Sequence, residues 1–216
     1  MGHFRSRLVV MTASKPSPAP EDRRRRKALR TRDALATAAC DLILERGPAA
    51  ATVEAIAERA DVTRRTFSRH FAGKEDAALD FVRRDGDRVN ALLRTRPAGE
   101  PPLLAYRRAV HAWLADPEDP AWHVRPRMRR LLALADTEPD LFAAYQRIRL
   151  DAQAPPAAVV DAAAGALIAA LRLWARAGGS DSPDADLAAL VERAYDALAA
   201  EAAAAAAARD SPATRA

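Results

Sequence analysis

The sequence predicts an all-α protein, and three observations support this fold class. Half of the 216 residues are apolar, which allows a sizeable core. Alanine, the best helix former, is very abundant. Apolar residues recur at three- and four-residue spacing along most of the chain, as on the buried face of a helix. We expect an N-terminal three-helix head that contains a helix-turn-helix, followed by a larger helical domain.

Positive charge is concentrated at the N-terminal end. Residues 1–32 hold ten lysine and arginine residues against two acidic ones, whereas the whole chain has a formal net charge of +5. Pro16, Pro18 and Pro20 disfavour a helix, so we expect residues 1–27 to form a disordered arm that ends in a basic run, Arg23–Lys27. Such an arm can follow phosphates or enter a minor groove, although a solubilising tail has the same composition.

Several classes of protein are disfavoured. No apolar run approaches the ~20 residues that cross a bilayer, and the first apolar segment is too short for a signal peptide, so we expect a cytoplasmic protein. Translation from Met11 is an alternative start. A single cysteine, Cys40, excludes a disulfide framework and predicts a small buried side chain. The four histidines lack metal-ligand spacing, and no nucleophile or phosphate-loop motif is present, so we expect no metal, cofactor or catalysis.

The stretch from Val53 to Phe71 has the pattern of a helix-turn-helix. An apolar helical stripe begins at Val53, and Thr63 is placed to cap a second short helix. Phe67 and Phe71 lie one turn apart and point inward, which leaves a basic outer face. Asp61, in the turn, is among the few residues besides glycine that tolerate a positive φ. This pattern predicts that the second helix enters a DNA major groove.

Other helices are expected on both sides of this stretch. The first long helix covers residues 28–46 and ends at Gly47 and Pro48. A fourth helix follows Gly73 and runs to about residue 93. Further helical patterns cover residues 103–115, 124–136, 140–153, 156–177 and 184–208. The chain then divides into an arm (1–27), a head (28–84), a helical domain (85–208) and a tail (209–216).

Several residues between about 30 and 78 stand at the spacing of one known family: Arg46-Gly47, Thr52, Ile56-Ala57, Ala60, Val62-Thr63, Thr66-Phe67, His70-Phe71 and Lys74-Glu75. This set resembles the TetR family of bacterial transcriptional regulators. The resemblance implies a DNA-binding head and a C-terminal domain that binds a small effector and dimerises through its last two long helices. Residues 64–71 and 96–103 more loosely resemble members with a mycofactocin-regulator-like domain for acyl-CoA-type ligands.

Three positions depart from the family's usual residues. Pro48 stands where an aromatic residue is usual, and Asp61 where a glycine is usual. Ser68 replaces an aromatic residue that often contacts phosphate. Serine can still donate to a phosphate, but with less reach and no ring to pack. These departures affect the detailed docking and not the fold.

We expect Arg64, Arg65 and Arg69 to read bases, because arginine can bond guanine through both arms. Other side chains on the head and arm are expected at phosphates or elsewhere on the DNA surface: Thr52, Thr63, Thr66, Ser68, His70, Lys74, Arg23, Arg24, Arg25 and Arg26. Alternatives remain for three of these residues. His70 could pack within the head, whereas Lys74 and Arg69 could simply be solvated.

The helical domain offers candidates for a ligand pocket and a dimer interface. The pocket candidates are Trp113, Trp122, Met128, Phe142, Tyr145 and Trp174, although ordinary core packing is the favoured interpretation of each. The interface candidates are Leu167, Leu171, Trp174, Leu187, Leu190, Val191, Tyr195 and Leu198. A basic cluster between Arg125 and Arg130 could meet an anionic ligand or form a solvated face.

The expected function is that of a homodimeric repressor on a pseudopalindromic double-stranded DNA operator. A small hydrophobic or acyl-CoA-like effector would release it by favouring another spacing of the two heads. The alternative is a helical DNA-binding protein without a small-molecule effector, regulated by a protein partner or by abundance. A hydrophobic cavity in the second domain would favour the first hypothesis, and solid alanine packing the second.

Overall fold

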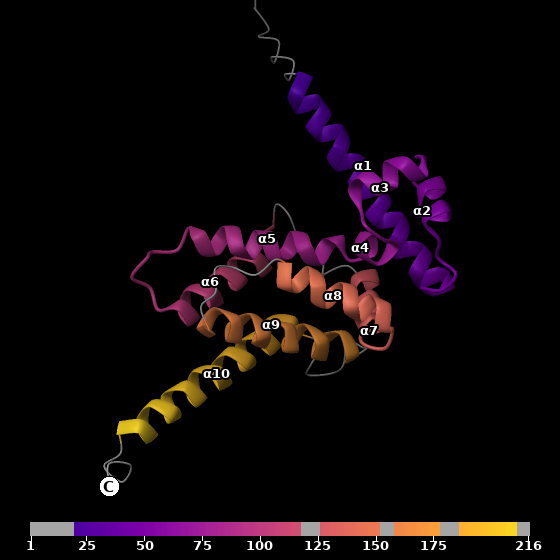
Figure 1. The fold of residues 1–216 in the computed structure, drawn as a ribbon. Helices are drawn as coiled ribbons and strands as arrows, with labels where there is room; N and C mark the ends of the chain where they lie inside the picture. Colours follow the sequence, from indigo (N-terminus) through magenta and orange to yellow (C-terminus); the bar gives the residue numbers. More distant parts are fainter. Residues whose placement is uncertain (1–19, 118–125, 152–157, 178–185, 211–216) are drawn as a thin grey trace, which may run out of the picture.

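The computed structural model describes residues 20–117, 126–151, 158–177 and 186–210. Every regular element in these ranges is a helix, which confirms the predicted fold class. The helices of the described residues are α1 (Pro20–Arg46), α2 (Val53–Arg59), α3 (Arg64–His70), α4 (Lys74–Ala78), α5 (Asp80–Arg94), α6 (Pro102–Leu114), α7 (Pro126–Ala135), α8 (Pro139–Asp151), α9 (Ala158–Arg176) and α10 (Leu187–Asp210). In Figure 1, α1–α4 form a head at one end of a body made of α5–α10.

The head is built around the apolar face of α1. Leu35, Ala39 and Leu42 are buried there at helical spacing, as predicted, and Cys40 is buried beside them. The α1 helix packs against α2 and α4, and α2 packs against α3. Burial of Phe67 from α3 completes this core, so the apolar spacing of the sequence directs how the head packs.

Two residues with positive φ end helices in the head. Gly47 has φ +82° and follows the last residue of α1, as expected for an αL cap. Asp61 has φ +52° in the turn between α2 and α3, as the sequence predicts. The turn holds its shape through backbone bonds from Asp61 N to Glu58 O and from Val62 N to Ala57 O, of 3.0 and 2.9 Å.

The helix α1 begins earlier than the sequence predicts. Pro20 is its first residue, so Arg23–Lys27 lies in a helix and not in a disordered arm. A proline fits the first helical turn because its missing N–H has no partner there in any case. Glu21 and Asp22 favour this start through the helix dipole. The side chains of residues 21–30 are all exposed. This part of α1 projects beyond the head (Figure 1).

The predicted fourth helix is broken into α4 and α5 at Leu79. Leu79 has φ −95° and ψ 13°, and its side chain is fully buried. The next residue, Asp80, is a carboxylate only 1% exposed, and it accepts hydrogen bonds from Arg32 of α1 and Arg84 of α5. Arg32 also donates to the backbone oxygen of His70 at 3.1 Å. This buried network ties α1, α3 and α5 together.

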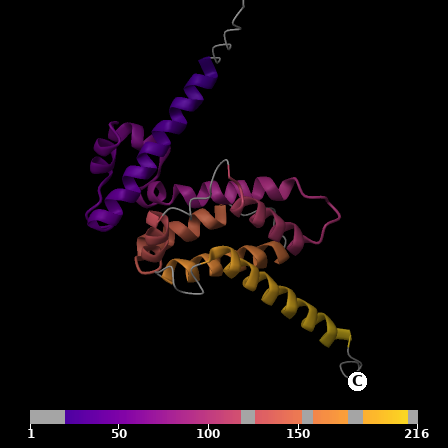
Figure 2. The same cartoon turned by 180° about the vertical axis from the view of Figure 1, so that it is seen from behind.

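The body surrounds a core made from all six of its helices. The pair α9 and α10 pack against each other, while α9 also contacts α6 and α7. The head contacts the body through α1 with α7, through α4 with α8 and through α4 with α5. Figures 1 and 2 both show the C-terminal half of α10 projecting away from the other helices, and residues 199–208 are exposed.

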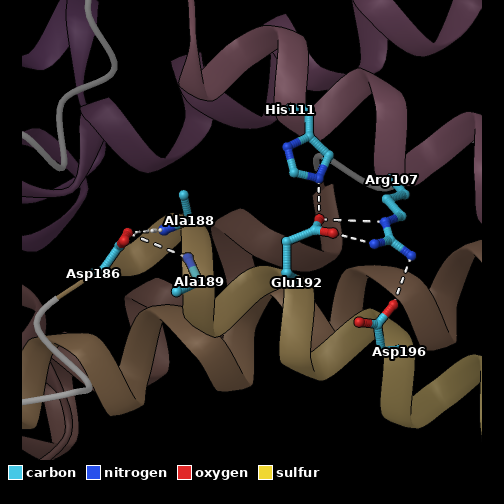
Figure 3. Close-up of polar contacts among 7 residues, drawn as sticks. All are labelled: Arg107, His111, Asp186, Ala188, Ala189, Glu192 and Asp196. Atoms are coloured by element: carbon cyan, nitrogen blue, oxygen red, sulfur yellow. Dashed lines mark hydrogen bonds and ion pairs between the residues drawn. The ribbon is translucent and has the colours of Figure 1, made fainter.

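A charged cluster attaches α10 to α6 (Figure 3). Arg107 of α6 donates to Glu192 and, at 2.9 Å, to Asp196, both on α10. His111, one turn further along α6, also contacts the carboxylate of Glu192. At the start of α10, Asp186 accepts from the backbone amides of residues 188 and 189 and caps the helix.

Within the described residues, no helix has both the length and the apolar character needed to cross a membrane. The same residues contain no group of three or more histidine, cysteine or carboxylate side chains that could hold a metal ion.

Candidate functional site

Local bonds and ring packing position the helix α3. Thr63 caps it, since its hydroxyl accepts from the amide of Thr66 at 3.2 Å. On the inner side, the rings of Phe67 and Phe71 lie 5.8 Å apart, and Arg32 lies over the Phe71 ring at 4.5 Å. These contacts hold one face of α3 against the head and direct the other face to solvent.

Three arginines occupy the outer face of α3. Arg65 and Arg69 are exposed, and neither has a hydrogen-bond or ion-pair partner among the described residues. Arg64 pairs with Glu54 of α2 at 3.1 Å, but the two side chains are 73% and 61% exposed. Exposed pairs of this kind contribute little energy, so Arg64 can exchange this partner for another. The outer face therefore presents three guanidinium groups that are available to a ligand.

The hydroxyls predicted at the DNA surface already have partners within the head. Thr52 caps α2 by accepting from the amide of Ala55 at 3.2 Å. The hydroxyls of Thr63 and Thr66 lie 3.0 Å apart, and Ser68 donates to the backbone oxygen of Arg64 at 3.2 Å. These residues shape the helix ends, and each hydroxyl oxygen retains acceptor or donor capacity for a second contact.

Lys74 and His70 are more internal than the sequence predicts. The Lys74 ammonium donates to the backbone oxygen of Pro48 at 2.5 Å, and its side chain is 25% exposed. This lysine joins the start of α4 to the loop after α1 and is not a free solvated side chain. His70 is half-buried, with its ring 6.4 Å from that of Phe71. This contact is consistent with packing within the head, and a DNA contact by His70 stays a prediction.

The four arginines predicted in the arm lie on the projecting start of α1. Arg23, Arg24, Arg25 and Arg26 are exposed, and Arg26 lies 3.7 Å from Asp22. Four consecutive helical residues spread around the helix, so their charges surround this segment. The segment is a basic rod that extends from the head.

A cavity of about 150 Å³ lies inside the body, between α5, α6, α8 and α9, with one residue from α7. Aromatic rings make up part of its wall: Phe81, Tyr106, Trp113 and Tyr145. Burial raises the pKa of both Tyr106 and Tyr145 to about 12, so both phenols stay protonated at neutral pH. Asp85, Asn90, Arg149 and Asp161 are the polar residues of the lining.

The predicted pocket residues divide into two groups. Trp113 and Tyr145 line the cavity, and the Trp113 ring donates to Asp85 at 3.1 Å. Met128 is core, Phe142 is at the surface, and Trp174 lies under the guanidinium of Arg129, so these three residues do not line this cavity. Trp122 lies outside the described residues. Aromatic character alone could not separate these cases, because core packing and ligand binding use the same side chains.

The predicted interface residues are mostly internal. Leu187, Leu190, Val191 and Tyr195 of α10 are buried within the chain itself. Leu167 and Leu171 of α9 line the cavity, Trp174 is buried, and Leu198 is partly buried. Most of these side chains are therefore covered by the chain itself and do not form an outer surface of α9 and α10. The sequence shows an apolar stripe on each helix. It does not show whether another helix of the same chain, a ligand or a second chain covers that stripe.

Comparisons with known proteins agree with the geometry of the head. The model of the family described as "Bacterial regulatory proteins, tetR family" matches residues 35–78. The HTH-type transcriptional regulator TcmR of Streptomyces glaucescens is 41% identical over 131 residues. Residues 35–78 are therefore similar to the DNA-binding head of the TetR family. Both matches are to regulatory proteins, in agreement with the resemblance found in the sequence.

The likeness to TcmR covers 57% of this chain and 56% of TcmR, little more than half of either protein. Among solved structures, a transcriptional regulator from Rhodococcus sp. Rha1 matches 76% of this chain and 91% of its own. That match has 25% sequence identity and a TM-score of 0.42.

Two features of the structure are not predicted by the sequence. Arg127 of α7 donates to Asp41 of α1 at 2.9 Å, and Arg147 of α8 donates to Asp76 of α4. These ion pairs connect the body to the head. Arg149, which lines the cavity, also drew no attention in the sequence. Arginine is frequent along this chain, and only the packing of α8 distinguishes these positions.

Proposed function

We propose that this protein is a homodimeric TetR repressor that binds a pseudopalindromic operator and is released by a small, largely apolar effector. The observation that carries the proposal is the pair Arg65 and Arg69, exposed and unpartnered on the outer face of a capped α3. Each can bond guanine through two donors, which discriminates against a wrong base by ~1–3 kcal/mol.

Phosphate contacts would add affinity without sequence information. The exposed arginines at the start of α1 and the hydroxyl groups around α3 are suited to this role. Lys74 is better suited to holding α4 against the loop at Pro48 than to contacting DNA directly. Binding should therefore weaken steeply as salt concentration rises, because phosphate contacts release counterions.

A single head reads too few base pairs to select one operator. A two-fold dimer reads two half-sites about one helical turn apart, ~34–36 Å. The pair α9 and α10 is our proposed interface, and the exposed alanine-rich end of α10 offers a surface for a second copy. The side chains at that interface would be those of the exposed faces, such as Leu173.

The cavity supports regulation by a small molecule over regulation by a protein partner alone. Its walls include α5 and α8, and α8 also holds α4 through the Arg147–Asp76 pair. A ligand that prefers another arrangement of these helices would shift the heads by its difference in affinity for the two states. A cavity of this size admits a compact ligand or an acyl group, but not a whole acyl-CoA.

Footprinting on the DNA upstream of the protein's own gene tests the proposal. The wild type should protect a pseudopalindromic site, and a double variant with Arg65→Ala and Arg69→Ala should lose it, with at least a tenfold rise in Kd. Arg94→Ala is the matched control, since this exposed arginine lies at the end of α5 far from the head (Figure 1). Protection that persists in the double variant would refute the assignment of α3.

A further inference from the structure

We propose that the effector is a compact aromatic acid whose carboxylate binds Arg149. This inference rests on the proposed function, since it names the class of ligand that the cavity takes. Two properties of the cavity carry it: the aromatic composition of its wall and an arginine whose buried Nε has no hydrogen-bond partner.

The wall favours a flat, unsaturated ligand. Phe81, Tyr106, Trp113 and Tyr145 come from three different helices, α5, α6 and α8, and converge on the cavity. Aromatic side chains prefer offset or edge-to-face contact with other rings, which gives an aromatic ligand an advantage over an aliphatic one of equal size. The volume of about 150 Å³ suits roughly one ring with a short substituent.

Arg149 supplies the polar specificity. It lines the cavity, its Nε is buried without a hydrogen-bond partner, and no ion pair joins it to another described residue. A buried charged donor without a partner is energetically costly, so the Arg149 guanidinium lacks an acceptor that a ligand could supply. A carboxylate provides two acceptors in the geometry that guanidinium prefers.

The acidic residues of the cavity lining do not form an ion pair with Arg149. Asp85 accepts from the Trp113 ring and lies 4.0 Å from Arg88. Asp161 is exposed on the first turns of α9. Neither is paired with Arg149, so an anionic group can approach the guanidinium without displacing an internal carboxylate.

Arg129 provides a contrast within the same body. Its Nε and one terminal nitrogen are also buried without hydrogen-bond partners, but its guanidinium lies 4.8 Å from the Trp174 ring centre. A cation above an aromatic face is stabilised by the ring. The charge of Arg129 is therefore stabilised within the protein, and Arg129 does not line the cavity. Arg149 does line the cavity, where a ligand can reach it.

Isothermal titration calorimetry with three ligands of one shape tests the inference. These are cinnamate, neutral cinnamamide and cationic cinnamylamine. The wild type should bind cinnamate at least about tenfold more tightly than cinnamamide, because the hydrogen bonds to a charged pair are stronger. Cinnamylamine should bind most weakly.

Variants separate the arginine from general packing. Arg149→Gln should bring the cinnamate-to-cinnamamide ratio close to one while the Kd of cinnamamide changes by less than about threefold. Arg149→Lys should keep part of the preference, and Arg129→Gln should keep all of it. Far-ultraviolet circular dichroism checks that each variant is folded. If Arg149→Gln is unfolded, the acid preference of Arg149→Lys tests the inference in its place.

Equal affinity for the acid and the amide, tightest binding of the amine, or no binding at millimolar concentration would overturn the inference. Footprinting of the ligand-free protein is a separate measurement. A specific footprint together with any of these outcomes refutes the ligand class and leaves the proposed DNA-binding function standing. Loss of the footprint with the acid preference intact refutes the DNA assignment instead.

Discussion

Arg147 on α8 donates to the carboxylate of Asp76 on α4, and this pair joins the wall of the cavity to the head. Tyr145, two residues earlier on the same helix, lines the cavity. The hydrogen bond that Arg147 donates to Asp76 raises the pKa of the guanidinium, so Arg147 stays positively charged. A shift of α8 would therefore be transmitted to α4.

Arg147→Gln should reduce the coupling between ligand and DNA. We expect DNA affinity without ligand to change little, while the factor by which saturating cinnamate weakens DNA binding falls severalfold. Fluorescence anisotropy of labelled operator, with and without cinnamate, measures this factor. Arg176→Gln is the matched control, because Arg176 is equally exposed and also bonds a nearly buried carboxylate, Asp136, but within the body. An equal loss in both variants would refute a specific role for the Arg147 pair.

Asp80→Ala should destabilise the whole protein. The Asp80 carboxylate is 1% exposed and forms ion pairs with both Arg32 and Arg84. Both arginines lose this ion pair in the variant. Removing one partner of a buried ion pair typically costs ~3–5 kcal/mol, and we expect about 3 because the two arginines are partly exposed. Urea denaturation measures the change. Asp33→Ala removes a half-exposed partner of the same Arg84 and should cost less than about 1 kcal/mol.

The Glu192 carboxylate should make stability depend on pH. The hydrogen bond from Arg107, reinforced by that from His111, lowers the pKa of Glu192 below its ordinary value of 4.5. A lowered pKa in the folded state means that the ionised group stabilises the protein above pH 4.5 and that this contribution disappears as pH falls below it. Thermal melts of wild type and Glu192→Gln should therefore differ at pH 7 and converge toward pH 3. A constant difference across this range would contradict the linkage.

The positive φ of Asp61 makes its replacement by glycine favourable. Glycine adopts φ +52° without a steric cost, so Asp61→Gly should match or exceed the wild-type melting temperature, whereas Asp61→Val should lower it. Gly47→Ala is a companion test at φ +82°, where an added Cβ meets no atom within 4 Å. Its expected loss of about 1 kcal/mol would then be purely conformational. A stabilising Gly47→Ala would show that the cap is not strained.

The sequence alone predicts the head in detail because its signals are local. Thr63 caps α3 through an amide three residues away, and Asp61 and Gly47 set their own backbone angles. The inward position of Phe67 follows from helical spacing within one turn. The predicted start of α1 is wrong because proline disfavours a helix interior, whereas Pro20 occupies the first helical turn, where proline is tolerated.

Only the tertiary structure decided what the body contains. Apolar residues such as Leu167 and Val191 could face a ligand, a second chain or the core, and spacing along the chain is the same in each case. The structure places the first at the cavity and the second in the core. Arg149 and Arg147 lie two residues apart on one helix, yet one faces the cavity and the other holds the head. Their roles depend on residues far away in the chain, whose positions local sequence does not determine.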